Sequence, residues 1–182
     1  MNSYRHLVML VAVLAWSGAL HADLYLELGF DSGGDRLAST TTGDSINAGG
    51  GVKFAIGTQN RLGDGSTAIR FAAGYLFDSL DAIDGSADFS AITLDGVYLM
   101  DSGPHTFGIG ATWHMSPEYS QTGGGYADID IKFDDAVGLL LEYGYSFDNG
   151  FKVGARYTDL NYDANNISLD ASSFGLFISS GF

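Results

Sequence analysis

The chain has 182 residues, of which 46% are hydrophobic and 26 are glycine, and its formal net charge is −14. This length accommodates one domain with a sizeable apolar surface. A chain this acidic is expected to repel nucleic acid, which argues against a nucleic-acid-binding role. Each glycine inside a helix costs roughly 1 kcal/mol, so the glycine content also argues against a helical fold.

Residues 1–22 have the features of an export signal. Arg5 provides a basic start, Leu7–Ala15 is an apolar run, and small residues lead to Ala22. The apolar run is too short for a helix that spans a bilayer, which needs about 20 residues. We therefore predict a signal peptide over residues 1–22 and a single domain over residues 23–182.

Cleavage is expected after Ala22, and Ser17–Ala19 offers the alternative site. Either position removes one charged residue, Arg5, so the mature domain is one unit more acidic than the whole chain. The chain contains no cysteine. The exported domain is therefore stabilised by something other than disulfides, although export would permit them.

The mature domain alternates between apolar and small or polar residues with a period of two. Residues 24–31 alternate strictly, which is typical of a two-faced β-strand. Their apolar face carries four side chains: Leu24, Leu26, Leu28 and Phe30. The same pattern recurs in seven further segments, at about 46–58, 67–77, 89–100, 105–113, 126–147, 151–158 and 171–182. The sequence thus predicts about eight strands.

The connections between these segments differ in length. Long polar stretches are expected to be loops at 32–45, 78–86, 115–125 and 159–167. Shorter connections lie at 59–66, 101–104 and 148–150, the last containing Asn149-Gly150, a strong hairpin signal. All long connections fall at one end of the predicted sheet. This asymmetry is typical of an outer-membrane barrel, which has short periplasmic turns and longer external loops.

Alternation alone does not say which face points outward, because a soluble lipocalin-like barrel has the same period with its apolar face inward. The interior of an eight-stranded barrel is just wide enough to be filled by side chains. It could not hold every Phe, Tyr, Leu and Ile of the apolar face, whereas the opposite face is mostly Gly, Ala, Ser and Thr. We therefore predict an all-β fold, an eight-stranded antiparallel up-and-down transmembrane β-barrel with its apolar face toward lipid.

The inward face also carries most of the basic residues of the mature domain, in mid-strand, together with a few carboxylates. An unpaired charge there would be very costly, so we predict an ion network in the lumen. Its expected members are Glu27, Lys53, Arg70, Asp95, Glu142, Lys152 and Arg156. If the barrel were soluble, the same charges would instead be solvated on its outer surface.

The last segment, 171–182, places Phe174, Leu176 and Ile178 on one face and ends on Phe182. A free terminal strand of this kind would be an aggregation-prone edge, so we expect it to pair with the first strand. The bulky Phe177 lies on the inward face and is predicted to fill the lumen.

The signal segment, about eight amphipathic strands and the terminal Phe182 together resemble the small outer-membrane β-barrels of Gram-negative bacteria, such as OmpA-like and OmpX-like barrels. The resemblance implies an outer-membrane location in contact with lipid and lipopolysaccharide. It also implies that the barrel-assembly machinery recognises the last strand through four residues: Phe174, Leu176, Ile178 and Phe182. We expect a monomer that binds no cofactor and no metal.

One short arrangement hints at catalysis. His114 and Ser116 are two residues apart, so in an extended segment they share a face, and the imidazole could activate the hydroxyl if a carboxylate oriented it. The pair is similar to the His-x-Ser of the lipid A deacylase barrels. Carried over, His114 would be the base, Ser116 the nucleophile and Asp128 a third member, although Pro117 stands where that family has Asn.

The predicted loops are rich in aspartate, but they contain no calcium-loop motif, so the interpretation is solvated loop charge. The leading hypothesis is a non-catalytic outer-membrane barrel with a packed polar lumen, acting in envelope integrity or in surface interaction through its external loops. The alternatives are a barrel enzyme that modifies lipid A and a narrow pore for small solutes.

Overall fold

The computed structural model describes residues 22–40, 43–63, 65–82, 85–123, 128–164 and 167–181. Residues 1–21 of the predicted signal peptide lie outside this part of the chain, as does Phe182. Among the described residues, no helix is long and apolar enough to cross a membrane.

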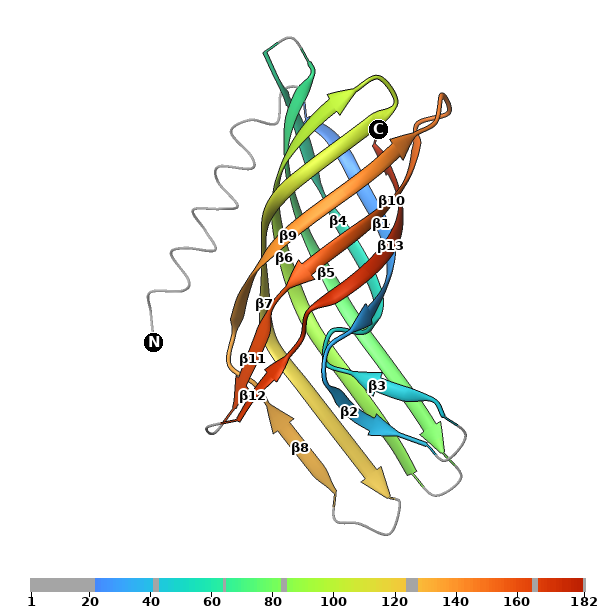
Figure 1. Ribbon diagram of the computed structural model, residues 1–182, viewed down its shortest axis with the longest axis vertical. Helices are drawn as coiled ribbons and strands as arrows, with labels where there is room; N and C mark the ends of the chain where they lie inside the picture. Colours follow the sequence, from blue (N-terminus) through green and yellow to red (C-terminus); the bar gives the residue numbers. More distant parts are fainter. Residues whose placement is uncertain are drawn as a thin grey trace.

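Eight long strands form a closed antiparallel barrel (Figure 1). In order around the wall they are β1 (Ala22–Gly33), β4 (Gly51–Leu62), β5 (Thr67–Ala82), β6 (Gly85–Ser102), β7 (His105–Gly123), β9 (Ala136–Ser146), β10 (Phe151–Asp159) and β13 (Ser173–Gly181). The first and last strands pair from Tyr25–Gly181 to Gly33–Ser173, which closes the wall. The predicted fold and the predicted pairing of the two terminal strands are confirmed.

The two ends of the barrel are built differently. Short turns join β4 to β5, β6 to β7 and β9 to β10 at the end that is uppermost in Figure 1. The opposite end carries the hairpin of β2 (Arg36–Ser39) with β3 (Ser45–Asn47) and the hairpin of β11 (Asn161–Ala164) with β12 (Ile167–Asp170). It also carries β8 (Ile129–Lys132), which pairs with β7. We call this second end the hairpin end.

The outer wall is apolar around the barrel. On β13, for example, the side chains of Phe174 and Leu176 are 58% and 61% exposed. Phe177, which lies between the outward residues Leu176 and Ile178, is only 5% exposed. Aromatic rings also contact one another across neighbouring strands on this wall, as in the pairs Phe54–Phe77 and Phe107–Tyr143. The predicted facing of the strands is therefore correct, with the bulky apolar side chains outside and Phe177 in the lumen.

Strand β6 changes its chemistry along its length. Toward the short turns its outward residues are apolar, such as Ile92, and its inward residues include the buried Asp95. Toward the hairpin end the outward face becomes polar and the inward face carries a large aromatic residue, because Asp88 is exposed and Phe89 is buried. A strand that only crosses a membrane needs about 9–11 residues. With 18 residues, β6 continues well past that length into a part built like a water-soluble β-sheet.

Strand β7 makes the same change through a bulge. Ser90 of β6 pairs with Glu118, but Ile92 pairs with Met115, so β7 contains one extra residue at this point. Ser116 within the bulge has a positive φ of 49°. The extra residue exchanges the two faces of the strand, which turns Tyr119 inward, where it is buried.

The predictions for the long connections were partly wrong. Residues 115–123, expected to be loop, belong to β7, and residues 78–82 belong to β5. The continuous strand expected at 126–147 is divided into β8 and β9, and Phe133 between them is buried. These errors share a cause: polar residues alternate with the apolar residues of an inner core, so the segments resemble loops in composition but form strands.

Gly154 of β10 leaves room for the ring of Phe177 inside the barrel. A Cβ at this position would lie 2.3 Å from Phe177 Cζ and 2.4 Å from the carbonyl oxygen of Tyr143. We expect Gly154→Ala to lower the free energy of unfolding by about 1–3 kcal/mol through overpacking. Urea titration of the protein in detergent micelles measures this change.

Gly96→Ala is the matched control, because a Cβ there meets only the Phe71 ring, at 3.5 Å. If the two substitutions had equal effects, the close packing of Phe177 on Gly154 would not be the cause.

Candidate functional site

The candidate site is a cluster of buried charges in the lumen. Arg70, which is 1% exposed, donates to both carboxylate oxygens of Glu142, with Nη1–Oε1 and Nη2–Oε2 distances of 2.9 and 2.6 Å. Arg156 forms the same two-pronged contact with Glu27, at 2.6 and 2.5 Å. Arg156 Nη2 also lies 3.3 Å from Glu142 Oε2, so the two pairs form one continuous network.

Aromatic rings contact the two guanidinium groups. The Tyr25 hydroxyl donates to Glu27 Oε2, and the Arg70 guanidinium carbon lies 4.4 Å from the centre of the Tyr25 ring. The Arg156 guanidinium carbon lies 5.0 Å from the centre of the Phe177 ring. Such cation–π contacts are worth more where water is excluded.

A second buried ion pair lies in the same lumen. Lys53 Nζ donates to Asp95 Oδ2 at 2.6 Å, and the Thr112 hydroxyl donates to Asp95 Oδ1 at 2.7 Å. Both oxygens of the carboxylate are therefore satisfied. This matters because a half-satisfied buried charge retains most of its desolvation cost.

Most of these pairs join strands that are not neighbours in the wall. Arg70 on β5 reaches Glu142 on β9, Glu27 on β1 reaches Arg156 on β10 past β13, and Lys53 on β4 reaches Asp95 on β6 past β5. The exception is Arg156–Glu142, whose strands pair directly. The network therefore fills the lumen and ties together strands from all around the barrel.

Lys152 differs from its expected role. It lies on the inward face and is half-buried, but within the described residues its ammonium group forms no ion pair. It is level with Ser146 and Ser179, closer to the short turns than Arg156. The physical reason is that its partners across both neighbouring strands, Ser146 and Ser179, carry no charge, so no carboxylate lies opposite it in either pair.

The structure does not place His114 and Ser116 on one face. His114 is buried and its Nδ1 is hydrogen-bonded to the Tyr162 hydroxyl of β11 at 2.5 Å, whereas Ser116 is exposed within the bulge. The Ser116 backbone N–H donates to Asp135 Oδ1 at 2.9 Å. Asp128 is exposed and precedes β8. No sequence pattern predicts the bulge. It separates the His114 imidazole from the Ser116 hydroxyl, which would have to lie together in a catalytic pair.

An apolar layer covers the charged cluster at the hairpin end. The inner faces of the strands and hairpins supply buried residues here, among them Ile46 of β3, Phe89 of β6, Tyr119 of β7 and Tyr162 of β11. Tyr162 contacts the Phe89 and Phe133 rings at centroid distances of 5.8 and 5.6 Å. Residues on the two hairpins therefore pack into the lumen rather than extending away from it.

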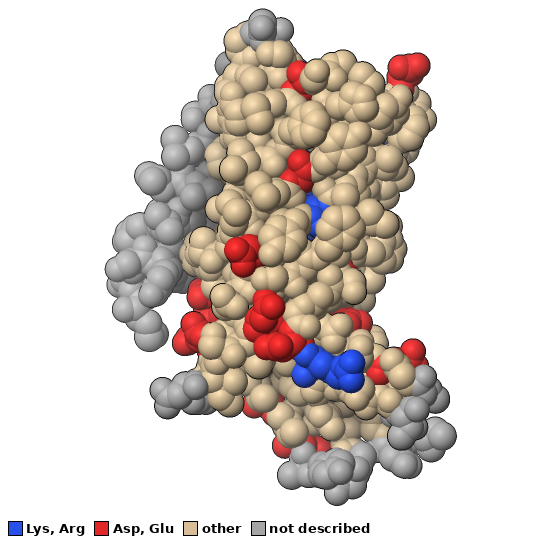
Figure 2. All heavy atoms as spheres, in the orientation of Figure 1, with Lys and Arg blue, Asp and Glu red and all other residues tan. Residues whose placement is uncertain are grey.

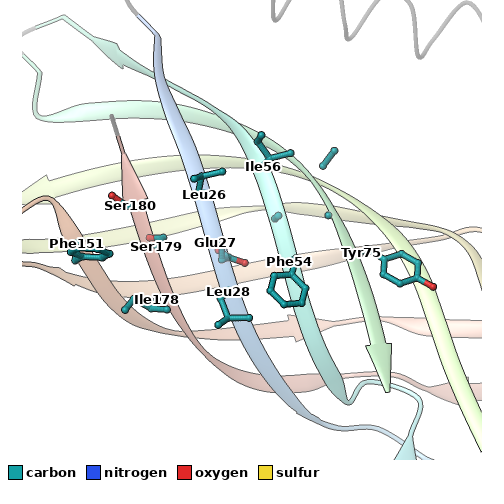
Figure 3. A pocket seen from close by; sticks show the side chains of 13 residues that line it. Leu26, Glu27, Leu28, Phe54, Ile56, Tyr75, Phe151, Ile178, Ser179 and Ser180 are labelled. Carbon is teal, nitrogen blue, oxygen red and sulfur yellow. The ribbon is translucent and has the colours of Figure 1, made fainter. Parts of the chain in front are cut away.

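A hollow of about 750 Å³ lies on the outer wall over β10, β13, β1, β4 and β5 (Figure 3). Apolar outward side chains surround it, including Leu26, Phe54 and Tyr75, and the small Ala73 leaves the space open. Among the described residues that line it, Glu27 and Ser179 are buried, so the hollow offers no convergent set of polar groups of the kind that orients a small-molecule ligand.

The charges outside the lumen are concentrated at one end. Figure 2 shows that acidic side chains gather toward the hairpin end, while most of the wall above it is uncharged. Within the described residues, no group of three or more His, Asp or Glu side chains is arranged to hold a metal ion.

Three of the four predicted assembly-signal residues, Phe174, Leu176 and Ile178, are exposed on the outer wall of β13. The fourth, Phe182, lies outside the described residues.

We expect Glu27→Gln to lower the free energy of unfolding by about 3–5 kcal/mol, because it leaves Arg156 buried without its main partner. Adding Arg156→Gln should recover part of the loss, since the unpaired charge is then removed. Urea titrations of the two single variants and the double variant give the coupling energy.

The exposed pair Lys132–Glu118, with a nitrogen–oxygen distance of 3.6 Å, is the control. Its double-mutant cycle should give less than about 1 kcal/mol. A coupling energy for Glu27 and Arg156 as small as that of this surface pair would contradict a stabilising role for the network.

No protein-family model and no curated protein matches the sequence. Solved structures do match. Ail, the attachment invasion locus protein of Yersinia pestis, is 8% identical with a TM-score of 0.56, over 90% of this chain and 100% of Ail. Neisserial surface protein A (NspA) is 14% identical with a TM-score of 0.53, over 88% of this chain and 97% of NspA. At these identities the likeness concerns the fold, so the chain has the fold of the small eight-stranded outer-membrane β-barrels.

Proposed function

We propose that this protein is a non-catalytic outer-membrane β-barrel that acts in envelope integrity or in surface interaction through its hairpin end. The observation that carries the proposal is the pairing of an apolar outer wall with a lumen filled by buried ion pairs. A soluble barrel has the opposite arrangement. In water the outer wall would be a very large exposed apolar surface, whereas in a bilayer it faces lipid tails.

In the outer membrane, the short turns of this barrel face the periplasm and the hairpin end faces the outside of the cell. The reversal of chemistry along β6 supports the placement, because the wall becomes polar outside and apolar inside where the strand leaves the membrane. The partners in this arrangement are outer-membrane lipid and lipopolysaccharide around the wall. During insertion, the barrel-assembly machinery reads the outward residues Phe174, Leu176 and Ile178, and the folded protein is a monomer.

The hairpin end is suited to contact with other molecules because it is a folded body. Its inner faces share the apolar layer described above, and its hairpins are joined by backbone hydrogen bonds, such as Asp35 N to Asp170 O at 2.7 Å. A rigid surface of this kind loses little conformational entropy on binding. The position of Ser116 apart from His114 favours this role over modification of lipid A.

We expect the protein to fractionate with the outer membrane and to migrate differently on gels before and after heating, as closed barrels do. In planar bilayers it should give no conductance, because the Arg70–Glu142 and Arg156–Glu27 pairs occupy the lumen. Recovery as a soluble periplasmic protein would overturn the proposal, and steady ion currents would favour the pore instead.

One solved neighbour, Ail, was crystallised in complex with the heparin analogue sucrose octasulfate. We expect this chain to bind that polyanion at least tenfold more weakly than Ail does, because like charges repel. The exposed acidic residues at its hairpin end include Asp35, Asp44, Asp88, Asp128, Asp130, Asp134, Asp163 and Asp170. Isothermal titration of sucrose octasulfate into both proteins in the same detergent makes the comparison, and equal affinities would contradict it.

A further inference from the structure

A small pocket lies between two neighbouring short turns of the barrel. Its volume is about 520 Å³, and it is lined by Gly103 and Pro104 of the β6–β7 turn and by Tyr145, Ser146, Phe147 and Asp148 at the end of β9. The Ser146 N–H donates to the Pro104 carbonyl at 2.8 Å, which holds the two turns together. The pocket is therefore part of the folded wall.

The lining combines aromatic rings with one carboxylate. Tyr145 and Phe147 meet edge to face at a centroid distance of 5.2 Å, and His105 meets Tyr145 edge to face at 5.5 Å. Both Tyr145 and Phe147 remain partly exposed, at 38% and 47%. Asp148 is exposed, and in the described part of the chain no basic side chain forms an ion pair with it.

This combination favours a cation. The face of an aromatic ring is negative and attracts an ammonium group, and the carboxylate of Asp148 adds a full negative charge. An anionic group such as a phosphate or a sulfate would instead be repelled. The pocket thus selects a small positively charged group that can approach from the side of the wall.

The position of the pocket identifies the molecule that carries this group. Tyr145 and Phe147 point outward at the end of the apolar wall, where aromatic residues of membrane barrels lie at the level of the lipid headgroups. We propose that the pocket binds the ammonium group of a phosphatidylethanolamine headgroup in the periplasmic leaflet. This inference rests on the membrane placement given under the proposed function.

The test compares phosphatidylethanolamine with phosphatidylglycerol at the two ends of the barrel. The wild-type chain without residues 1–22 contains one tryptophan, Trp113, which reports on the hairpin-end side of the wall. A variant that combines Trp113→Phe with Phe151→Trp places the reporter at the β9–β10 turn, outside the pocket lining, and we call it the turn reporter. Each protein is folded into phosphatidylglycerol vesicles that contain increasing fractions of phosphatidylethanolamine with brominated acyl chains, and fluorescence quenching gives the relative binding constant.

We expect the turn reporter to show a preference of about fivefold for phosphatidylethanolamine, in line with an exposed cation–π contact plus a carboxylate. Trp113 in the wild-type chain should show no such preference. Asp148→Asn in the turn reporter should reduce the preference to about one. Asp23→Asn, which removes an exposed carboxylate outside the pocket lining, should leave it unchanged.

Equal binding of the two lipids by the turn reporter would overturn the inference. So would a preference for phosphatidylethanolamine that remains in the Asp148→Asn variant. The inference would also fail if Asp23→Asn reduced the preference as much as Asp148→Asn does. Heat-modifiable migration of the same vesicle samples shows whether the protein has inserted, and so distinguishes failure of the lipid-binding inference from failure of the proposed function. A protein that fails to insert contradicts the proposed function, whereas an inserted protein without lipid preference contradicts only the pocket.

Discussion

The structure depends on one constraint: a charge that is fully buried in the middle of the closed barrel has no access to bulk water and must find its partner within the lumen. Arg70, Arg156, Glu27 and Glu142 satisfy this constraint together, and Lys53 with Asp95 satisfies it separately. Their pairing lets polar side chains fill the space that large apolar side chains would occupy in a soluble barrel. The large apolar side chains therefore lie on the outer wall. The buried ion pairs and the apolar outer surface thus depend on each other.

Much of this could be predicted from the sequence because the period of a β-strand is short and regular. The alternation of Leu24, Leu26 and Leu28 with Tyr25 and Glu27 gives both the strand and its facing. The ion network follows from the volume available in the lumen and the cost of an unpaired charge. The identity of each pair does not follow, because Glu27 and Arg156 meet past an intervening strand and their contact depends on the stagger of the whole barrel.

The predictions failed where the surroundings of the chain change. Residues 115–123 continue β7, but the bulge at Ser116 exchanges their faces, so a fixed period of two fails there. It is also why His114 and Ser116, two apart in sequence, have different surroundings. Phe133 and Tyr119 share the parity of outward residues but are buried under the hairpins. A single period of two predicts the facing of residues within one environment. Strands β6 and β7 each pass through two environments, the part with the apolar outer wall and the hairpin end.

The ion pairs that skip strands bear on the order in which the barrel can form. Glu27 and Arg156 are 129 positions apart, and Arg70 and Glu142 are 72 apart. Contacts of such long range form late, because the loop between them must close first. A growing sheet that holds β1 but not yet β10 therefore carries an unneutralised carboxylate at Glu27. Folding should be all-or-none as a result, with β13 arriving between β1 and β10 in the same step that neutralises the lumen.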